Sequence, residues 1–316
     1  GWDFTMRPTY DDWWKARSAY ERLKDITIPV LSIGHQGKMG LHERGNIIGY
    51  EDVSGPKKLI LTGAKDAFEA HDLYDKIEVH EKWMKAFYDY YLKGVDNGYD
   101  SKTPNVQLFV RGADEWISEP EWPLKRAVYT PWYLREGRSN SVTSLNDGRL
   151  SLEAPATEEG ATDYSYPDPK WHFGVASMGP QGPDPVARNL TFTSDPLTKD
   201  ITIAGPIVAE LFVSSTNTDT EVFVKVTDQH PQSAGDRSKG LQPGWMIAAK
   251  GWLRASHREK DNARSTELRP FYTHTNPQPI EPGKVYKLDI EVWPSAHCFK
   301  AGHRIRVDIA IGDSMM

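Results

Sequence analysis

The chain has 316 residues, and its 44 acidic and 38 basic side chains give a formal net charge of -6 at pH 7. The basic residues are scattered, which argues against nucleic acid or an anionic membrane as a partner. The single cysteine, Cys298, excludes an internal disulfide framework, and no apolar run approaches the ~20 residues that span a bilayer. We therefore expect a cytoplasmic protein.

The first predicted element is a helix that begins near Thr9. Thr9 is suited to be its N-cap, because Asp12 follows three residues later. Trp13 then starts an apolar face that continues at helical spacing to Leu23. This pattern predicts an amphipathic helix near the start of the chain.

Two short buried strands are expected next, over residues 26–33 and 59–61. A polar, helix-bearing connection joins them. A second helix should start near Asp75 and end at Lys93 and Gly94, because large apolar side chains recur along one of its faces. This order of elements is typical of the closing half of a doubly wound parallel sheet.

In such a sheet, functional groups lie on the loops that follow the carboxyl ends of the strands. Here these loops are residues 34–46 and 64–74. Both are rich in polar side chains, namely His35, Gln36, Lys38, His42, Glu43 and Arg44 in the first and Lys65, Asp66, Glu69, His71 and Asp72 in the second. The candidate site residues therefore come from these two loops.

Residues 101–316 alternate apolar and polar side chains in several segments, which predicts mainly antiparallel β-structure. The apolar positions are Val106, Leu108 and Val110; Val222, Val224 and Val226; Tyr286, Leu288, Ile290 and Val292; and Ile305, Val307 and Ile309. The fold class expected from these patterns is α/β followed by all-β.

Nine segments, taken together in their order and spacing, match a known family. They are residues 28–34, 41–46, 87–94, 192–197, 205–206, 219–221, 226–228, 251–258 and 301–304. The chain resembles the later two-thirds of a CocE/NonD hydrolase, a family related to cocaine esterase, α-amino-acid ester hydrolases and X-Pro dipeptidyl-peptidases. The resemblance implies that residues 1–100 are the closing part of an α/β-hydrolase domain with a cap helix. It implies a jelly-roll β-sandwich for residues 101–316.

The sequence departs from the family pattern in its nucleophile, acid and base. Gly-x-Ser-x-Gly, the motif that carries the nucleophilic serine, occurs nowhere in the sequence. Lys38 stands where the family has an aspartate, and Lys65 and Asp66 stand where it has a histidine. We therefore expect a fragment, one subunit of a split enzyme completed by a second chain or segment, or a scaffold put to another use. A homo-oligomer is a further expectation.

His71 is the nearest candidate for the catalytic base. It would need a carboxylate to orient it, from Glu43, Asp66 or Asp72, and a serine within hydrogen-bond reach. The alternative is a loop histidine that bonds the backbone of Asp72 and takes no part in chemistry.

Three further residues are candidates for substrate binding. His35 and His42 lie in the first polar loop, and Trp13 lies in the helix assigned to the cap. A solvated ion pair with Arg44 would explain the polar loop equally well, and Trp13 would also be explained by packing of the cap.

The resemblance implies hydrolysis of esters or amides, with small acyl groups or X-Pro peptides as substrates. No cluster of histidine, cysteine and acidic residues has the spacing of a metal site, so we expect no metal and no organic cofactor. Two alternatives stay open. One is a non-catalytic jelly-roll module for binding or assembly. The other is a degenerate hydrolase scaffold used in a biosynthetic pathway, which Lys38 and Lys65 favour.

Overall fold

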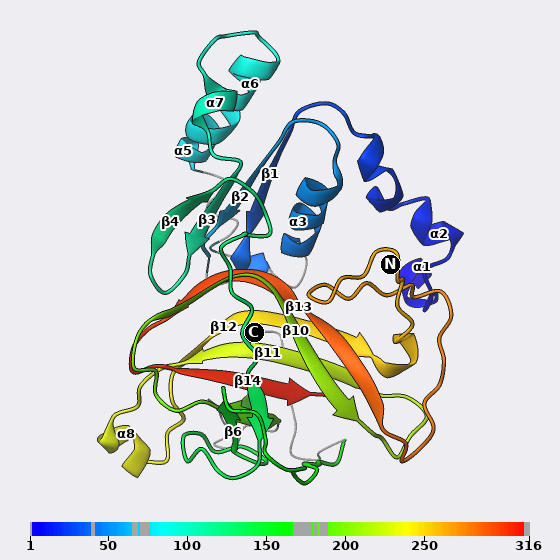
Figure 1. Cartoon of the computed structure of the whole chain (residues 1–316), viewed down its shortest axis with the longest axis vertical. Helices are drawn as coiled ribbons and strands as arrows, with labels where there is room; N and C mark the ends of the chain where they lie inside the picture. Colours follow the sequence, from blue (N-terminus) through cyan, green and yellow to red (C-terminus); the bar gives the residue numbers. More distant parts are fainter. Residues whose placement is uncertain are drawn as a thin grey trace. The chain divides into compact units, whose positions relative to one another are not determined.

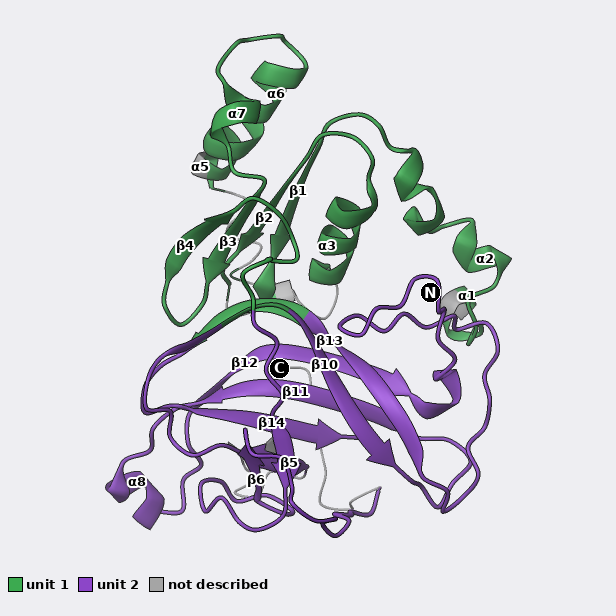
Figure 2. Ribbon diagram, viewed as in Figure 1, with its two compact units in different colours: residues 1–127, 203–205, 294–298 green, residues 128–202, 206–293, 299–316 purple. Residues whose placement is uncertain are grey.

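The computed structural model describes residues 2–38, 42–64, 69, 76–166, 178–179, 182–183 and 189–312. The chain forms two compact units, shown in two colours in Figure 2. Unit 1 comprises residues 1–127, 203–205 and 294–298, and unit 2 comprises residues 128–202, 206–293 and 299–316. Among the described residues, no helix is long and apolar enough to cross a membrane.

Unit 1 begins with three short helical segments, α1 (Trp2–Thr5), α2 (Asp12–Lys15) and η1 (Tyr20–Asp25). The single helix predicted from Thr9 is wrong. Asp11 is the N-cap of α2, because its carboxylate accepts the backbone N–H groups of Trp13 and Trp14 at 3.0 and 3.3 Å. Neither α2 nor η1 buries a residue. Without tertiary packing, such short segments do not extend into a long helix.

The two predicted buried strands are present as β1 (Val30–His35) and β2 (Lys57–Thr62), which run parallel. β1 begins later than predicted and continues through Gly34 to His35. Gly34 is needed there, since an added Cβ would lie 2.8 Å from the side chain of Leu61. The connection contains the 3-10 turn η2 (Gln36–Lys38) and the helix α3 (Glu43–Asp52).

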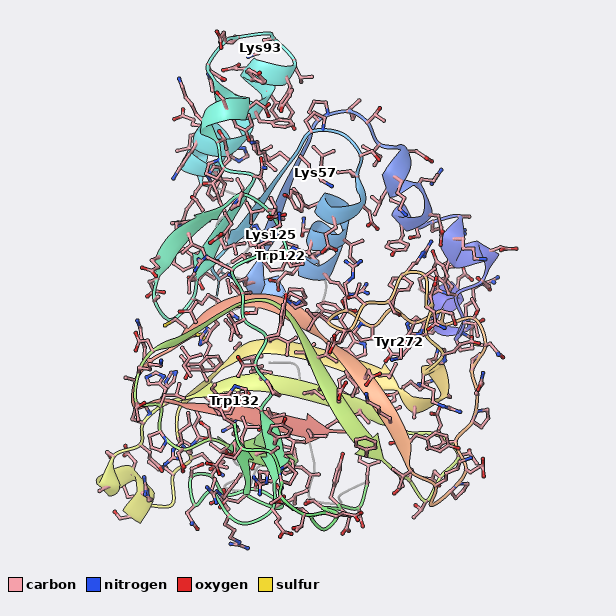
Figure 3. The ribbon with its side chains drawn as sticks, viewed as in Figure 1. Lys57, Lys93, Trp122, Lys125, Trp132 and Tyr272 are labelled. Atoms are coloured by element: carbon pink, nitrogen blue, oxygen red, sulfur yellow. The ribbon has the colours of Figure 1, made fainter. Side chains whose placement is uncertain are left out.

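Lys57, labelled in Figure 3, ties the end of α3 to the start of β2. Its Nζ donates to the backbone carbonyls of Glu51 and Val53 at 2.8 and 2.9 Å. These are carbonyls at the end of α3, where a cation is favoured by the helix dipole. The contact fixes the helix against the sheet whose carboxyl edge carries the candidate loops.

Residues 101–127, assigned by the sequence to the second part, add two strands to the first sheet. β3 (Val106–Val110) is parallel to β2, and β4 (Glu115–Glu119) is antiparallel to β3, giving the order β1-β2-β3-β4. The predicted alternation in β3 is confirmed, because Val106, Leu108 and Val110 are fully buried, while Gln107 and Phe109 between them are only partly buried. The three fully buried residues belong to a core that also contains Ile47, Tyr50, Leu59, Leu61, Trp122, Leu124, Ala296 and Cys298.

The second predicted helix is also present. It consists of α5 (Ile77–Val79), a π-helical stretch η3 (His80–Lys85) and α6 (Ala86–Tyr91), and α7 (Tyr99–Lys102) follows it. Gly94 adopts φ +67°, which is the left-handed conformation expected after a helix end. Its predicted start at Asp75 lies outside the described residues.

Unit 2 is built on a curled eight-stranded sheet (Figure 1) of order β10-β13-β12-β11-β14-β9-β6-β5. Its strands are β5 (Tyr133–Arg135), β6 (Gly148–Ser151), β9 (Leu190–Thr193), β10 (Ile201–Val213), β11 (Glu221–Gln229), β12 (Trp245–Arg254), β13 (Tyr286–Phe299) and β14 (Arg304–Ala310). The hairpin β7 (Met178–Gly179) and β8 (Gly182–Pro183), the helix α8 (Ala234–Ser238) and the turn η4 (Ala255–His257) complete the described elements.

The predicted fold class, α/β followed by all-β, is confirmed. β14 nevertheless has a feature that its sequence pattern does not predict, because Arg306 and Asp308 on its polar face are each only 7% exposed. They form an ion pair at 2.9 Å. A polar face of a strand is therefore not always a solvated face. The expected domain boundary between residues 100 and 101 stays a prediction.

Candidate functional site

Strands β1 and β2 end side by side at His35 and Thr62, which are partners in the parallel register. Both side chains are buried, and Nδ1 of His35 shares a hydrogen bond with Oγ1 of Thr62. The sequence predicted that His35 lies in the loop after this strand, whereas the structure makes it the last residue of β1. Its imidazole, however, is only 2% exposed, so in this structure it belongs to the interior of unit 1.

Gln36 fastens the end of β1 to two other parts of unit 1. Its side-chain NH2 donates to the carbonyl of Phe109 at 2.7 Å. Its Oε1 accepts the backbone N–H of Ala296 at 2.8 Å and the hydroxyl of Ser295 at 3.4 Å. Because the side chain is fully buried, these bonds replace the water that it loses.

Glu43 is the first residue of α3 and is fully buried. Neither of its carboxyl oxygens forms a hydrogen bond with a described residue. Burial raises the pKa of Glu43 to about 8, and the charge of Arg111 opposes this shift only in part. The carboxyl is therefore mostly protonated at pH 7 and becomes ionised just above it.

Arg111 directly follows β3 and is the buried cation that interacts with Glu43. Its guanidinium donates to the hydroxyl of Ser295 at 3.3 Å. Its backbone N–H and C=O bond Ala296 and Cys298 at 3.1 and 2.7 Å. Burial lowers the pKa of Arg111 and the charge of Glu43 raises it, but an arginine stays charged at neutral pH.

We call these six residues of unit 1 the carboxyl-end cluster. They are His35, Gln36, Glu43, Thr62, Arg111 and Ser295. At pH 7 the cluster holds a guanidinium charge beside a largely neutral carboxylic acid. The carboxyl of Glu43 can gain or lose a proton near this pH, whereas the guanidinium of Arg111 stays charged and favours a negatively charged group nearby. The cluster thus has the chemistry of a functional site within unit 1.

Of the other predicted binding residues, the structure describes His42 and Trp13. His42 precedes Glu43 but is exposed, and its side chain does not cap α3. The described ring contacts of Trp13 are with nearby residues in the chain, namely Trp14 at 5.0 Å and the guanidinium groups of Arg17 at 3.9 Å and Arg7 at 5.4 Å. The remaining candidates, His71, Asp72, Asp66 and Lys65, lie outside the described residues.

Sequence reasoning did not single out Gln36 or Arg111 as site residues. A charged residue directly after the alternating apolar strand Val106–Val110 was the available signal for Arg111. The polar loop at 34–46 contained Gln36 without any reason to prefer it. Their partner, Ser295, is 184 residues from Arg111 in the chain, so only the folded structure reveals the contact.

Comparison with known proteins places these observations in a family. Residues 97–316 match the profile described as the X-Pro dipeptidyl-peptidase C-terminal non-catalytic domain. Over 324 aligned residues the chain is 29% identical to cocaine esterase from Rhodococcus sp. (strain MB1 Bresler), covering 96% of this chain and 52% of that protein. The earlier resemblance to CocE/NonD hydrolases is thereby confirmed.

Solved structures agree in fold. A CocE/NonD family hydrolase from Staphylococcus aureus superposes with a TM-score of 0.70 at 24% identity, covering 99% of this chain and 51% of that one. An α-amino acid ester hydrolase superposes with a TM-score of 0.67 at 18% identity, covering 97% of this chain and 52% of that one. The chain thus spans about half the length of these relatives.

Proposed function

The chain belongs to the family of the X-Pro dipeptidyl-peptidase C-terminal non-catalytic domain over residues 97–316, and from this premise we propose that it is part of a serine hydrolase that cleaves ester or amide bonds. The relatives are named as an esterase and as hydrolases, which supports a hydrolase. The profile concerns a domain described as non-catalytic. We therefore place the proposed chemistry in the residues before it, which include His35, Glu43 and other members of the carboxyl-end cluster. Arg111 and Ser295 lie within residues 97–316, and we assign them a supporting role.

The reaction that we propose is acyl transfer through a serine. A serine hydroxyl attacks the carbonyl carbon, a histidine takes the hydroxyl proton, and backbone N–H groups stabilise the oxyanion. The histidine then returns the proton to the leaving alcohol or amine. Because the sequence has no Gly-x-Ser-x-Gly, we assign the serine to a segment outside these 316 residues.

His71 is the proposed base, and Glu43 or Asp72 is the proposed acid that orients it. The observation that carries the role of Glu43 is its burial without a hydrogen bond to any described residue. A buried carboxyl that lacks such bonds is costly to keep and calls for a reason. To stabilise an imidazolium it must be ionised, so a pKa of about 8 predicts activity that rises as the pH increases through 8.

The proposed substrates are small acyl esters, amides or short X-Pro peptides, as the names of the family and of the relatives suggest. His35, His42 and Trp13 remain proposed substrate contacts. We further propose that a second chain or segment completes the hydrolase domain, or that copies of this chain associate.

One specific observation favours a second candidate function. Lys38 and Lys65 stand where the family has its acid and its base. A chain without this acid and base would retain the hydrolase scaffold and its β-domain. It would serve as a binding or assembly module, or it would take part in another reaction.

Labelling by a fluorophosphonate probe separates the two candidates, because the probe reacts only with an activated serine. We expect the native polypeptide that contains this chain to be labelled, and His71→Ala to reduce labelling sharply while His80→Ala, at an exposed histidine, does not. Native protein that is folded but unlabelled would contradict the hydrolase. Turnover that is unchanged in His71→Ala would remove His71 from its role.

A further inference from the structure

Asp228, His230 and His303 gather at one end of the strand pair β11 and β14 in unit 2. The antiparallel register pairs Gln229 with Arg304, so His230 faces His303 one step further along. Side chains two residues apart lie on the same face of a strand, which places Asp228 beside His230. One ligand atom from each of the three lies within 4.8 Å of the other two.

Asp228 holds His303 in the orientation of a metal ligand. Nδ1 of His303 lies 2.8 Å from Oδ1 of Asp228, and the two side chains are 22% and 4% exposed. A carboxylate that accepts a hydrogen bond from Nδ1–H of a neutral imidazole leaves the lone pair on Nε2. This carboxylate–histidine arrangement is the usual second layer around a metal-bound imidazole.

His230 supplies a second imidazole to the same place. Its ring centroid lies 4.9 Å from that of His303. Its backbone N–H donates to the carbonyl of Gly244 at 2.8 Å, and a Cβ added to Gly244 would lie 3.4 Å from its Nδ1. Either ring nitrogen of His230 can serve as the ligand atom. The ring is partly exposed, which provides a path of entry.

We propose that this group binds one divalent transition-metal ion, with Zn²⁺ as the reference ion. His230 and His303 would be the ligands, Asp228 would orient His303, and water would complete the coordination. Imidazole favours zinc, copper, nickel and iron, whereas magnesium and calcium prefer oxygen ligands. Nitrogens bound to tetrahedral zinc lie about 3.4 Å apart, and the two rings, whose centroids lie 4.9 Å apart, would each turn one nitrogen toward the ion.

The ion would join the ends of β11 and β14, and it plays no part in the hydrolysis proposed for unit 1. The sequence predicted no metal, because Asp228 and His303 are 75 residues apart and no linear spacing relates them. In the part of the chain that the structure describes, no other group of three histidine, cysteine or acidic residues is this close together. Strand pairing creates the site.

Calorimetric titration of the EDTA-treated full chain with Zn²⁺ tests the proposal. We expect one Zn²⁺ per chain and no binding of Mg²⁺. His230→Gln should weaken Zn²⁺ binding at least tenfold, because it removes a ligand without disturbing the Asp228–His303 bond. Asp228→Asn should weaken it by about 10- to 100-fold through the orientation of His303. His80→Gln, at an exposed histidine of unit 1, is the control and should leave binding unchanged.

A hydrogen bond between Asp228 and His303 could close the strand ends without any ion, and the role of His230 decides between the two accounts. Absence of stoichiometric Zn²⁺ binding by the folded parent would overturn the proposal. Equal affinity in parent and His230→Gln would also overturn it. If the variants fail to fold, the visible absorption spectrum of the Co²⁺-loaded parent decides, because nitrogen-ligated tetrahedral Co²⁺ absorbs strongly and hydrated Co²⁺ does not.

Discussion

Each unit buries an acid together with an arginine, and the two pairs are built in opposite ways. In unit 2, Asp308 accepts from Thr227 at 2.7 Å and from Asn189 at 3.2 Å, and it pairs with Arg306 at 2.9 Å. In unit 1, Glu43 interacts with Arg111 through charge but forms no hydrogen bond with a described residue. The carboxylate of Asp308 thus has three polar partners, whereas the carboxyl of Glu43 forms no hydrogen bond with a described residue.

The difference is the one expected between a structural pair and the pair that we propose to be functional. A buried carboxylate surrounded by donors links neighbouring segments, since Asp308 of β14 bonds Thr227 of β11 and Asn189 just before β9. A buried carboxyl without donors is neutral near pH 7, and it can gain a proton or lose one when a charged group approaches. Structural and functional acids should therefore respond differently to substitution and to pH.

The largest expected effect is the loss of stability in Asp308→Ala. Removing this carboxylate leaves the guanidinium of Arg306 buried without its counter-charge, which should cost about 3–5 kcal/mol of unfolding free energy. Urea denaturation followed by tryptophan fluorescence measures it. Asp163→Ala, at an exposed aspartate of the same unit, should change the unfolding free energy by less than about 0.5 kcal/mol. Equal effects would show that the buried network of unit 2 has no structural role.

The next effect is a change in the pH dependence of stability in Glu43→Gln. The pKa of Glu43 is about 8 in the folded chain and 4.5 as a free side chain. Between these values the native state keeps a proton that the unfolded state releases. The parent should therefore lose stability as the pH rises, by at most about 1.4 kcal/mol per pH unit.

Glutamine cannot ionise, so the unfolding free energy of Glu43→Gln should lack this decrease with pH. The variant should therefore become more stable relative to the parent as the pH rises from 5 to 8. The same urea titrations, repeated across that range, make the comparison. Glu81→Gln, at an exposed glutamate, is the matched control and should keep the slope of the parent. Parallel curves for parent and Glu43→Gln would show that Glu43 is ionised throughout.

The smallest effect distinguishes two threonines of unit 2 that are both about 1% exposed. Oγ1 of Thr227 donates to Asp308, while Oγ1 of Thr193 forms no hydrogen bond with a described residue. Thr227→Val should cost about 1–2 kcal/mol, because it removes a donor from a buried carboxylate. Thr193→Val makes the same chemical change and should be neutral or stabilising. A larger loss of unfolding free energy in Thr193→Val than in Thr227→Val would contradict this prediction.

The sequence predicted those features that depend on neighbours along the chain. Val106, Leu108 and Val110 recur at every second position, and all three are buried in β3. The same kind of pattern does not predict the burial of Arg306 in β14, which depends on contacts with other strands such as the bond to Gln229 of β11. Thr9 was a plausible cap, but Asp11 forms the capping bonds, and both are acceptable caps by residue type.

The candidate site was predicted only where strand ends determine it. His35 and Glu43 follow from the rule that functional groups lie at the carboxyl ends of parallel strands. Gln36 and Arg111 became site residues through residues 294–298, which return to unit 1 from the far end of the sequence. No local pattern encodes such a contact, just as no linear spacing relates Asp228 to His303.

The pH dependence of ester hydrolysis by the native polypeptide, compared between parent and Glu43→Gln, tests the functional role of Glu43 most directly. We predict that the rate of the parent rises through about pH 8, as Glu43 ionises. Glu43→Gln should be slower and should lack this ionisation, while Glu81→Gln keeps it. A Glu43→Gln profile that coincides with that of the parent would contradict the account.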